Sequence, residues 1–108
     1  MTDALSTLSA TIRARRLATD PAQAPSYTRQ LLDAGPARCA RKFGEEAVEA
    51  VIAATCQSRE ELTAEAADVI YHLLVLLESR DVAWADVAAK LASRSGTSGM
   101  TEKAGRAK

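Results

Sequence analysis

Apolar side chains recur at steps of three and four residues through most of the chain, which is the spacing of one face of an α-helix. Prolines, glycines and capping residues divide this pattern into five segments. The predicted helices run from Thr2 to Ala18, from Ser26 to Gly35, from Pro36 to Cys56, from Ser58 to Ser79 and from Trp84 to Arg94. No stretch alternates like a strand, so we expect an all-α fold, a small helical bundle.

The two longest segments should form the centre of this bundle as an antiparallel hairpin that turns near residue 57. The predicted apolar face of the third helix runs through Ala40, Phe43, Ala47, Val51 and Ala54. The fourth helix starts at a capping box, Ser58 with Glu61, and its C-terminal half is apolar nearly all round. Such a segment belongs in an interior, which a dimer could supply.

Composition makes the expected core thin. Hydrophobic residues make up 47% of the 108 positions, but alanine is the commonest of them and only four are aromatic Phe, Trp or Tyr. Alanine favours helices but gains little from burial. We therefore expect one domain over residues 1–108, with a second copy of the chain covering part of its apolar surface.

Charge is balanced overall, with 14 basic and 14 acidic side chains, so a surface for nucleic acid or membrane is not expected. The balance conceals three blocks, with net charges of +4 over 1–42, −8 over 43–89 and +4 over 90–108. Residues 1–25 are expected to be an N-terminal helix and linker, and 95–108 a flexible basic tail.

Two cysteines, Cys39 and Cys56, show no metal-binding spacing, and we interpret both as buried thiols of a reducing compartment. The longest apolar run is too short to span a bilayer, and no signal peptide is evident. We expect a cytoplasmic protein.

Five carboxylates of the acidic block should converge across the hairpin. Like charges three or four residues apart on one helix disfavour it unless something compensates them. The hairpin places the second group at the height of the first, where a cluster of hard oxygen ligands suits Mg²⁺ better than calcium, zinc or iron. The candidates are Glu45, Glu46, Glu49, Glu65 and Asp68. A solvated acidic face is the alternative interpretation.

Cations and aromatics could complete a site for a phosphate-bearing ligand. Lys42 and Arg38 extend the same stripe, where they could contact phosphate or merely pair within the helix. We favour phosphate for Lys42 and leave Arg38 open. Tyr27 or Trp84 could stack on a base, although a scarce aromatic usually packs in the core, and His72 is expected to pack in the core.

The EExxE and ExxD pattern resembles the all-α nucleoside triphosphate pyrophosphohydrolases, the MazG-like superfamily. Within it, the stretches SYTRQLLDAG, KFGEEAVEAVIAA, ELTAEAADVIYHLLVLL and SGTSGMTEKAGR resemble the phosphoribosyl-ATP pyrophosphohydrolases. The resemblance implies a Mg²⁺-dependent homodimer that hydrolyses phosphoribosyl-ATP to phosphoribosyl-AMP and pyrophosphate, the second step of histidine biosynthesis.

Carried over by residue, the resemblance gives metal ligands, a residue that orients or deprotonates water, and phosphate contacts. The ligands are Glu46, Glu49, Glu65 and Asp68; Glu45 acts on water; Lys42 binds phosphate; and Tyr27, in the SYT stretch, is a better candidate than Trp84 for a substrate contact. Two alternatives stay open: a housekeeping nucleoside triphosphate pyrophosphohydrolase, and a non-enzymatic helical dimerisation module.

Overall fold

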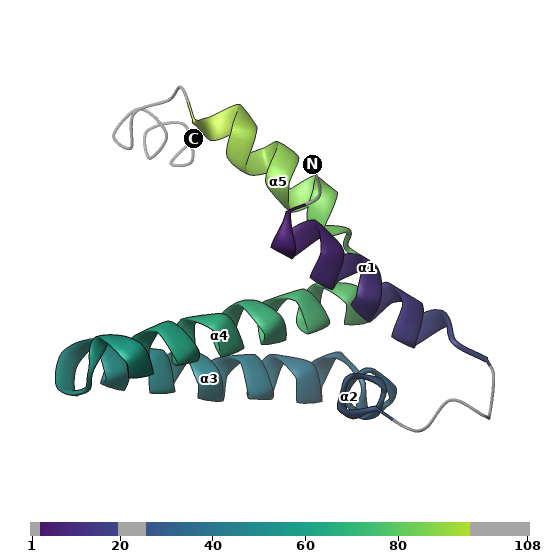
Figure 1. Ribbon diagram of the computed structural model, residues 1–108. Helices are drawn as coiled ribbons and strands as arrows, with labels where there is room; N and C mark the ends of the chain where they lie inside the picture. Colours follow the sequence, from purple (N-terminus) through teal and green to yellow (C-terminus); the bar gives the residue numbers. More distant parts are fainter. Residues whose placement is uncertain (1–2, 20–25, 96–108) are drawn as a thin grey trace, which may run out of the picture.

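The computed structural model describes residues 3–19 and 26–95, and these form five helices and no strand (Figure 1). The helices are α1 (Ala4–Leu17), α2 (Tyr27–Ala34), α3 (Pro36–Cys56), α4 (Arg59–Ser79) and α5 (Trp84–Arg94). The predicted all-α fold is confirmed, and every predicted helix is present within about two residues of its expected ends. The segments 20–25 and 96–108, where most of the linker and the basic tail were predicted, lie outside the described residues.

Short side chains at the N-caps explain why the helices begin where they do. The hydroxyl oxygen of Ser26 accepts a hydrogen bond from the backbone N–H of Arg29 at 3.0 Å, and that of Ser58 accepts from Glu61 at 3.1 Å. Gly35 separates α2 from α3 with a φ of 96°, a backbone conformation that favours glycine. These signals are local, so the sequence alone could predict them.

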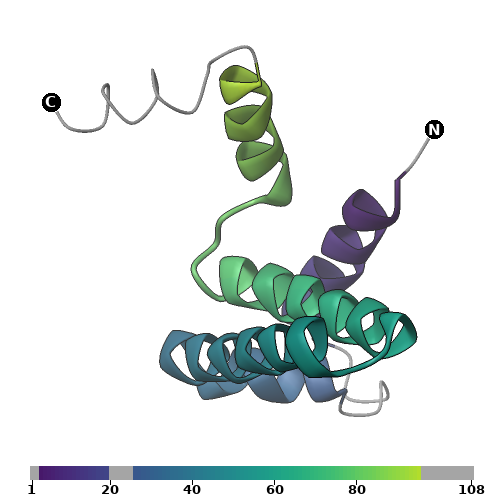
Figure 2. The same cartoon turned by 90° about the vertical axis from the view of Figure 1, so that its left-hand side faces the viewer.

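The hairpin of α3 and α4 is the long central unit, and the two helices lie side by side in both views (Figures 1 and 2). The buried residues of α3 are spaced seven positions apart on one face of the helix: Cys39, Glu46 and Ala53. The predicted apolar face of α3 was therefore partly wrong, since Val51 is 64% exposed. Helix α3 carries small or apolar side chains on two faces, and periodicity could not tell which one turns inward.

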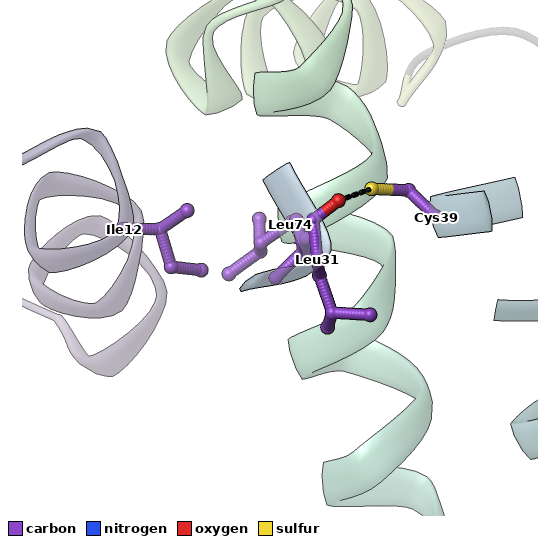
Figure 3. Close-up of a cluster of buried hydrophobic side chains, with 5 residues drawn as sticks. Ile12, Leu31, Cys39 and Leu74 are labelled. Atoms are coloured by element: carbon purple, nitrogen blue, oxygen red, sulfur yellow. Dashed lines mark hydrogen bonds between the residues drawn. The ribbon is translucent and has the colours of Figure 1, made fainter. Parts of the chain in front are cut away.

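The core lies where the first four helices meet. Ile12, Leu31, Cys39 and Leu74 come together from α1, α2, α3 and α4 (Figure 3), and Val75 belongs to the same buried cluster. The thiol of Cys39 donates a hydrogen bond to the carbonyl oxygen of Leu31 at 3.2 Å, and burial raises the pKa of this thiol. This core is as thin as the composition predicts.

Two further features bear on sequence expectations. Cys56 is exposed at the end of α3, so the prediction that both cysteines are buried holds only for Cys39. Helix α5 projects from the hairpin and contributes no fully buried residue, although Trp84 packs against the core (Figure 2). None of the helices in the described part of the chain has the length and apolarity needed to cross a bilayer.

An ion-pair cluster attaches α1 to the end of α4. The Glu78 carboxylate, only 4% exposed, accepts hydrogen bonds from the guanidinium groups of Arg13 and Arg16. The same two arginines donate to Asp81, which sits in the turn after α4 with a φ of 56°. The paired carboxylates raise the pKa of Arg13, Glu78 having the larger effect.

Candidate metal and substrate site

Three carboxylates converge between the two helices of the hairpin. One oxygen from each of Glu46, Glu49 and Glu65 lies within 4.8 Å of the others. Glu46 and Glu49 are three residues apart and share a face of α3, while Glu65 approaches from α4. The turn at residues 57–58 produces this meeting, because it sets residues at equal distances from the turn opposite each other.

Two of the three glutamates are at least partly buried, and this burial favours a bound cation. Glu46 is 9% exposed, Glu65 is half-buried and Glu49 is open to solvent. The Oε2 atom of Glu65 is buried without a hydrogen-bond partner within the described residues. A buried carboxylate oxygen without a partner is costly, and so is the repulsion of three like charges. A metal ion would relieve both costs.

The chemistry of the donors selects the kind of metal. The cluster offers only carboxylate oxygens, whereas zinc and iron sites normally recruit histidine or cysteine. Magnesium takes one or two carboxylates and fills its shell with water and substrate phosphates. The residues present therefore fit Mg²⁺.

The other two predicted carboxylates lie outside this group of three. Glu45 is exposed on α3, where its Oε2 atom pairs with the Nζ atom of Lys42 at 3.5 Å. Asp68 is exposed on α4, close enough for its charge to oppose the lowering of the His72 pKa that burial causes. The structure thus brings together three of the four predicted ligands, and the roles of Glu45 and Asp68 stay predictions.

Lys42 supplies a positive charge at the edge of the carboxylate cluster. Its Nζ atom lies 3.6 Å from Oε1 of Glu46 as well as near Glu45, and its side chain is 25% exposed. The negative charge that the Tyr27 phenol carries when ionised raises the pKa of Lys42 most, followed by these two glutamates. Intrahelical pairing is therefore present, and it leaves the cation beside the acids. Arg38 is exposed and takes no part in the ion pairs found among residues 3–19 and 26–95.

Tyr27 begins α2 and borders the same region. Its side chain is 49% exposed, and its ring meets the ring of His72 edge-on, with centroids 6.1 Å apart. His72 is 6% exposed, which confirms its predicted place in the core. Burial lowers the pKa of His72, and the nearby charge of Glu46 opposes this shift without reversing it.

Tyr71 is a neighbour of this region that sequence reasoning did not single out. Its hydroxyl group shares a hydrogen bond with the hydroxyl group of Thr28 on α2. Because the two residues are 43 positions apart, no local pattern could have indicated the pairing.

An all-α hairpin with a carboxylate cluster suited to a hard cation, and a lysine beside it, can hold a metal ion and a phosphate group together. Comparison with known proteins specifies the family. Residues 5–95 match the family model described as phosphoribosyl-ATP pyrophosphohydrolase.

Relatives named phosphoribosyl-ATP pyrophosphatase match nearly the whole chain. The protein of Jannaschia sp. is 58% identical over 94% of this chain and 97% of its own length. That of Cereibacter sphaeroides is 57% identical over 94% and 96%, and that of Roseobacter denitrificans is 57% identical over 96% of each. The chain therefore belongs to the phosphoribosyl-ATP pyrophosphohydrolase family and is a hydrolase.

Proposed function

We propose that the chain hydrolyses phosphoribosyl-ATP with Mg²⁺ held by Glu46, Glu49 and Glu65, and with Asp68 as a fourth ligand. The family assignment supports the reaction: water cleaves the bond between the α and β phosphates and releases phosphoribosyl-AMP and pyrophosphate. This is the second step of histidine biosynthesis. The observation that carries the metal site is the convergence of three carboxylates around a buried oxygen without a partner.

The chain's own residues bind and orient the reactants. Lys42 exchanges part of its pairing with the glutamates for the phosphate oxygens of the substrate. Glu45, exposed beside the cluster, orients or deprotonates the attacking water, a role it could exchange with one of the ligands. Bound magnesium would neutralise phosphate charge and lower the pKa of water. Positioning and electrostatics suffice for this chemistry, so a covalent nucleophile is not required.

Two further side chains are proposed to contact the substrate. Tyr27 has an exposed ring at the start of α2, and such a ring can stack on the adenine. Arg38 lies one helical turn before Lys42 on α3 and is free to reach a phosphate from solvent.

The functional unit is proposed to be a homodimer in the cytoplasm. Val48, Val51 and Ile52 share a face of α3 and are 59%, 64% and 46% exposed, an apolar surface that a second copy would cover. Cys56 is a free and exposed thiol, a state that a reducing compartment such as the cytoplasm preserves.

Pyrophosphate release measured with phosphoribosyl-ATP and with a panel of deoxynucleoside triphosphates tests the substrate. We expect strong preference for phosphoribosyl-ATP, loss of the activity with EDTA, and recovery when Mg²⁺ is added back. Preference for the panel would point instead to a housekeeping pyrophosphohydrolase, and activity that survives EDTA would contradict the metal site.

A further inference from the structure

Tyr27, the first residue of α2, can hold a fixed position only if other helices contact the start of α2. Helix α2 has only eight residues, and helices of this length are unstable alone in water. Its other end reaches α3 through Gly35, which lacks a side chain and adopts a positive φ. The orientation of Tyr27 therefore depends on what α2 touches beyond its own turn.

Two adjacent residues of α4 provide that support. The hydroxyl group of Tyr71 is hydrogen-bonded to that of Thr28, the residue after Tyr27. The ring of His72 meets Tyr27 edge-on at 6.1 Å and Tyr71 edge-on at 4.9 Å. Three rings thus form a row from α4 to the first residue of α2, with edge-to-face contacts that aromatic rings favour.

The row ends at the candidate site and not elsewhere on the surface. Tyr27 lies close enough to Lys42 for a charge on its phenol oxygen to raise the pKa of the lysine, and Lys42 pairs with Glu46 of the carboxylate cluster. His72 is buried, so it touches Tyr27 without being open to a substrate. The two α4 residues therefore reach the exposed ring of Tyr27 through contacts with the first two residues of α2.

We propose that Tyr71 and His72 are positioning residues: the Thr28–Tyr71 hydrogen bond and the ring row hold Tyr27 beside Lys42 so that both meet the substrate together. This proposal rests on the proposed function, because it takes Tyr27 and Lys42 to be substrate contacts. Neither residue belongs to the carboxylate cluster, so their loss should weaken substrate binding and change the turnover rate little.

Tyr71→Phe and Thr28→Val each remove one hydroxyl group and keep the shape of the side chain. We expect each to raise the KM for phosphoribosyl-ATP roughly three- to ten-fold, the effect of losing one hydrogen bond, with kcat within about two-fold of the wild type. The double variant should be no worse than either single one, because both remove the same bond. Thr11→Val removes a threonine hydroxyl bonded within α1 and should leave KM unchanged.

The ring row is tested at His72, with one substitution that keeps a ring and one that does not. His72→Phe should keep KM near the wild-type value, whereas His72→Leu should raise it as Tyr71→Phe does. A purely structural role would lower the unfolding temperature of these variants and leave KM unchanged at temperatures where they are folded, which would overturn the proposal.

The Tyr27→Leu variant distinguishes two results: that the positioning role of Tyr71 and His72 is wrong, or that Tyr27 does not contact the substrate. If Tyr27→Leu raises KM while Tyr71→Phe and His72→Leu do not, the contact stands and the positioning role is wrong. If Tyr27→Leu also leaves KM unchanged, the assigned substrate contact is wrong and the positioning role fails with it.

Discussion

Glu65 shows at the scale of a single residue how burial can indicate a ligand. One of its carboxylate oxygens is buried without a hydrogen-bond partner in the described part of the chain, while oxygens of Glu46 and Glu49 lie within 4.8 Å. Isolated acidic triplets on exposed helices carry little information, since solvent compensates them. Packing of α3 against α4 removes that solvent from one oxygen of Glu65. The carboxylate cluster then needs a bound cation to compensate its charge.

Lys42 gives a prediction at the same scale. Lys42→Gln should raise the KM for phosphoribosyl-ATP roughly ten-fold or more, because a charged hydrogen bond to phosphate is lost. Initial rates of pyrophosphate release over a range of substrate concentrations measure this. Lys90→Gln, which removes an exposed lysine from α5, is the matched control and should change nothing. An unchanged KM in Lys42→Gln would mean that the lysine serves only its intrahelical pairs.

The helices themselves could be predicted closely, because their ends depend on neighbouring residues. Ser26 and Ser58 cap α2 and α4 as the sequence indicates, and Gly35 with Pro36 divides α2 from α3. The inward face of α3 could not be predicted, because it depends on contacts that arrive from other helices. The same reason hides the Thr28–Tyr71 bond and the exposure of Cys56.

The candidate site was predicted in part for the same physical reason. Residues three apart on a helix and a hairpin turn near residue 57 suffice to bring Glu46, Glu49 and Glu65 together. The place of Asp68 outside that group depends on side-chain positions that spacing does not specify.

Glu78 gives a prediction at the scale of elements, because it joins α1 to α4. Glu78→Gln keeps the size of the side chain but removes the buried charge between Arg13 and Arg16. We expect the free energy of unfolding to fall by about 1–2 kcal/mol, at the low end for such bonds because both arginines are partly exposed.

Urea unfolding followed by circular dichroism measures this change. Arg15→Gln alters an exposed arginine of α1 outside the cluster and should stay within about 0.5 kcal/mol of the wild type. If Glu78→Gln were equally neutral, α1 would be held by apolar contacts such as those of Ile12 alone.

At the scale of the whole molecule, several large apolar side chains of the described residues are exposed to solvent. Val48, Val51 and Ile52 on α3 are exposed, and Ile70 on α4 is 40% exposed. Apolar side chains gathered on one helix face usually mark an interface. This exposed surface of α3 shares only Val51 with the apolar face predicted from the sequence, and it is the surface that we propose a second copy covers.

Val51→Asp tests this interpretation, because a charge at the centre of an apolar interface leaves an unpaired carboxylate there. Sedimentation velocity at micromolar concentration should show a dimer for the wild type and a folded monomer for the variant. Leu17→Asp, at a position 61% exposed on α1, should leave the dimer intact. A wild-type monomer, or an unaffected dimer in Val51→Asp, would contradict the proposed interface.

The rate of pyrophosphate release by Glu49→Gln, with phosphoribosyl-ATP and Mg²⁺ at saturation, tests the metal site most directly. The substitution keeps the side chain's size and removes the one charge of the cluster that is open to solvent, so the helical content of the protein should be unchanged. Glu60→Gln, an exposed acid in the first turn of α4, should retain wild-type activity. We predict that Glu49→Gln loses roughly a hundred-fold or more in rate, since even indirect support of a metal ligand is worth 10- to 100-fold. A folded Glu49→Gln variant with full activity would show that the carboxylate cluster does not hold the catalytic metal.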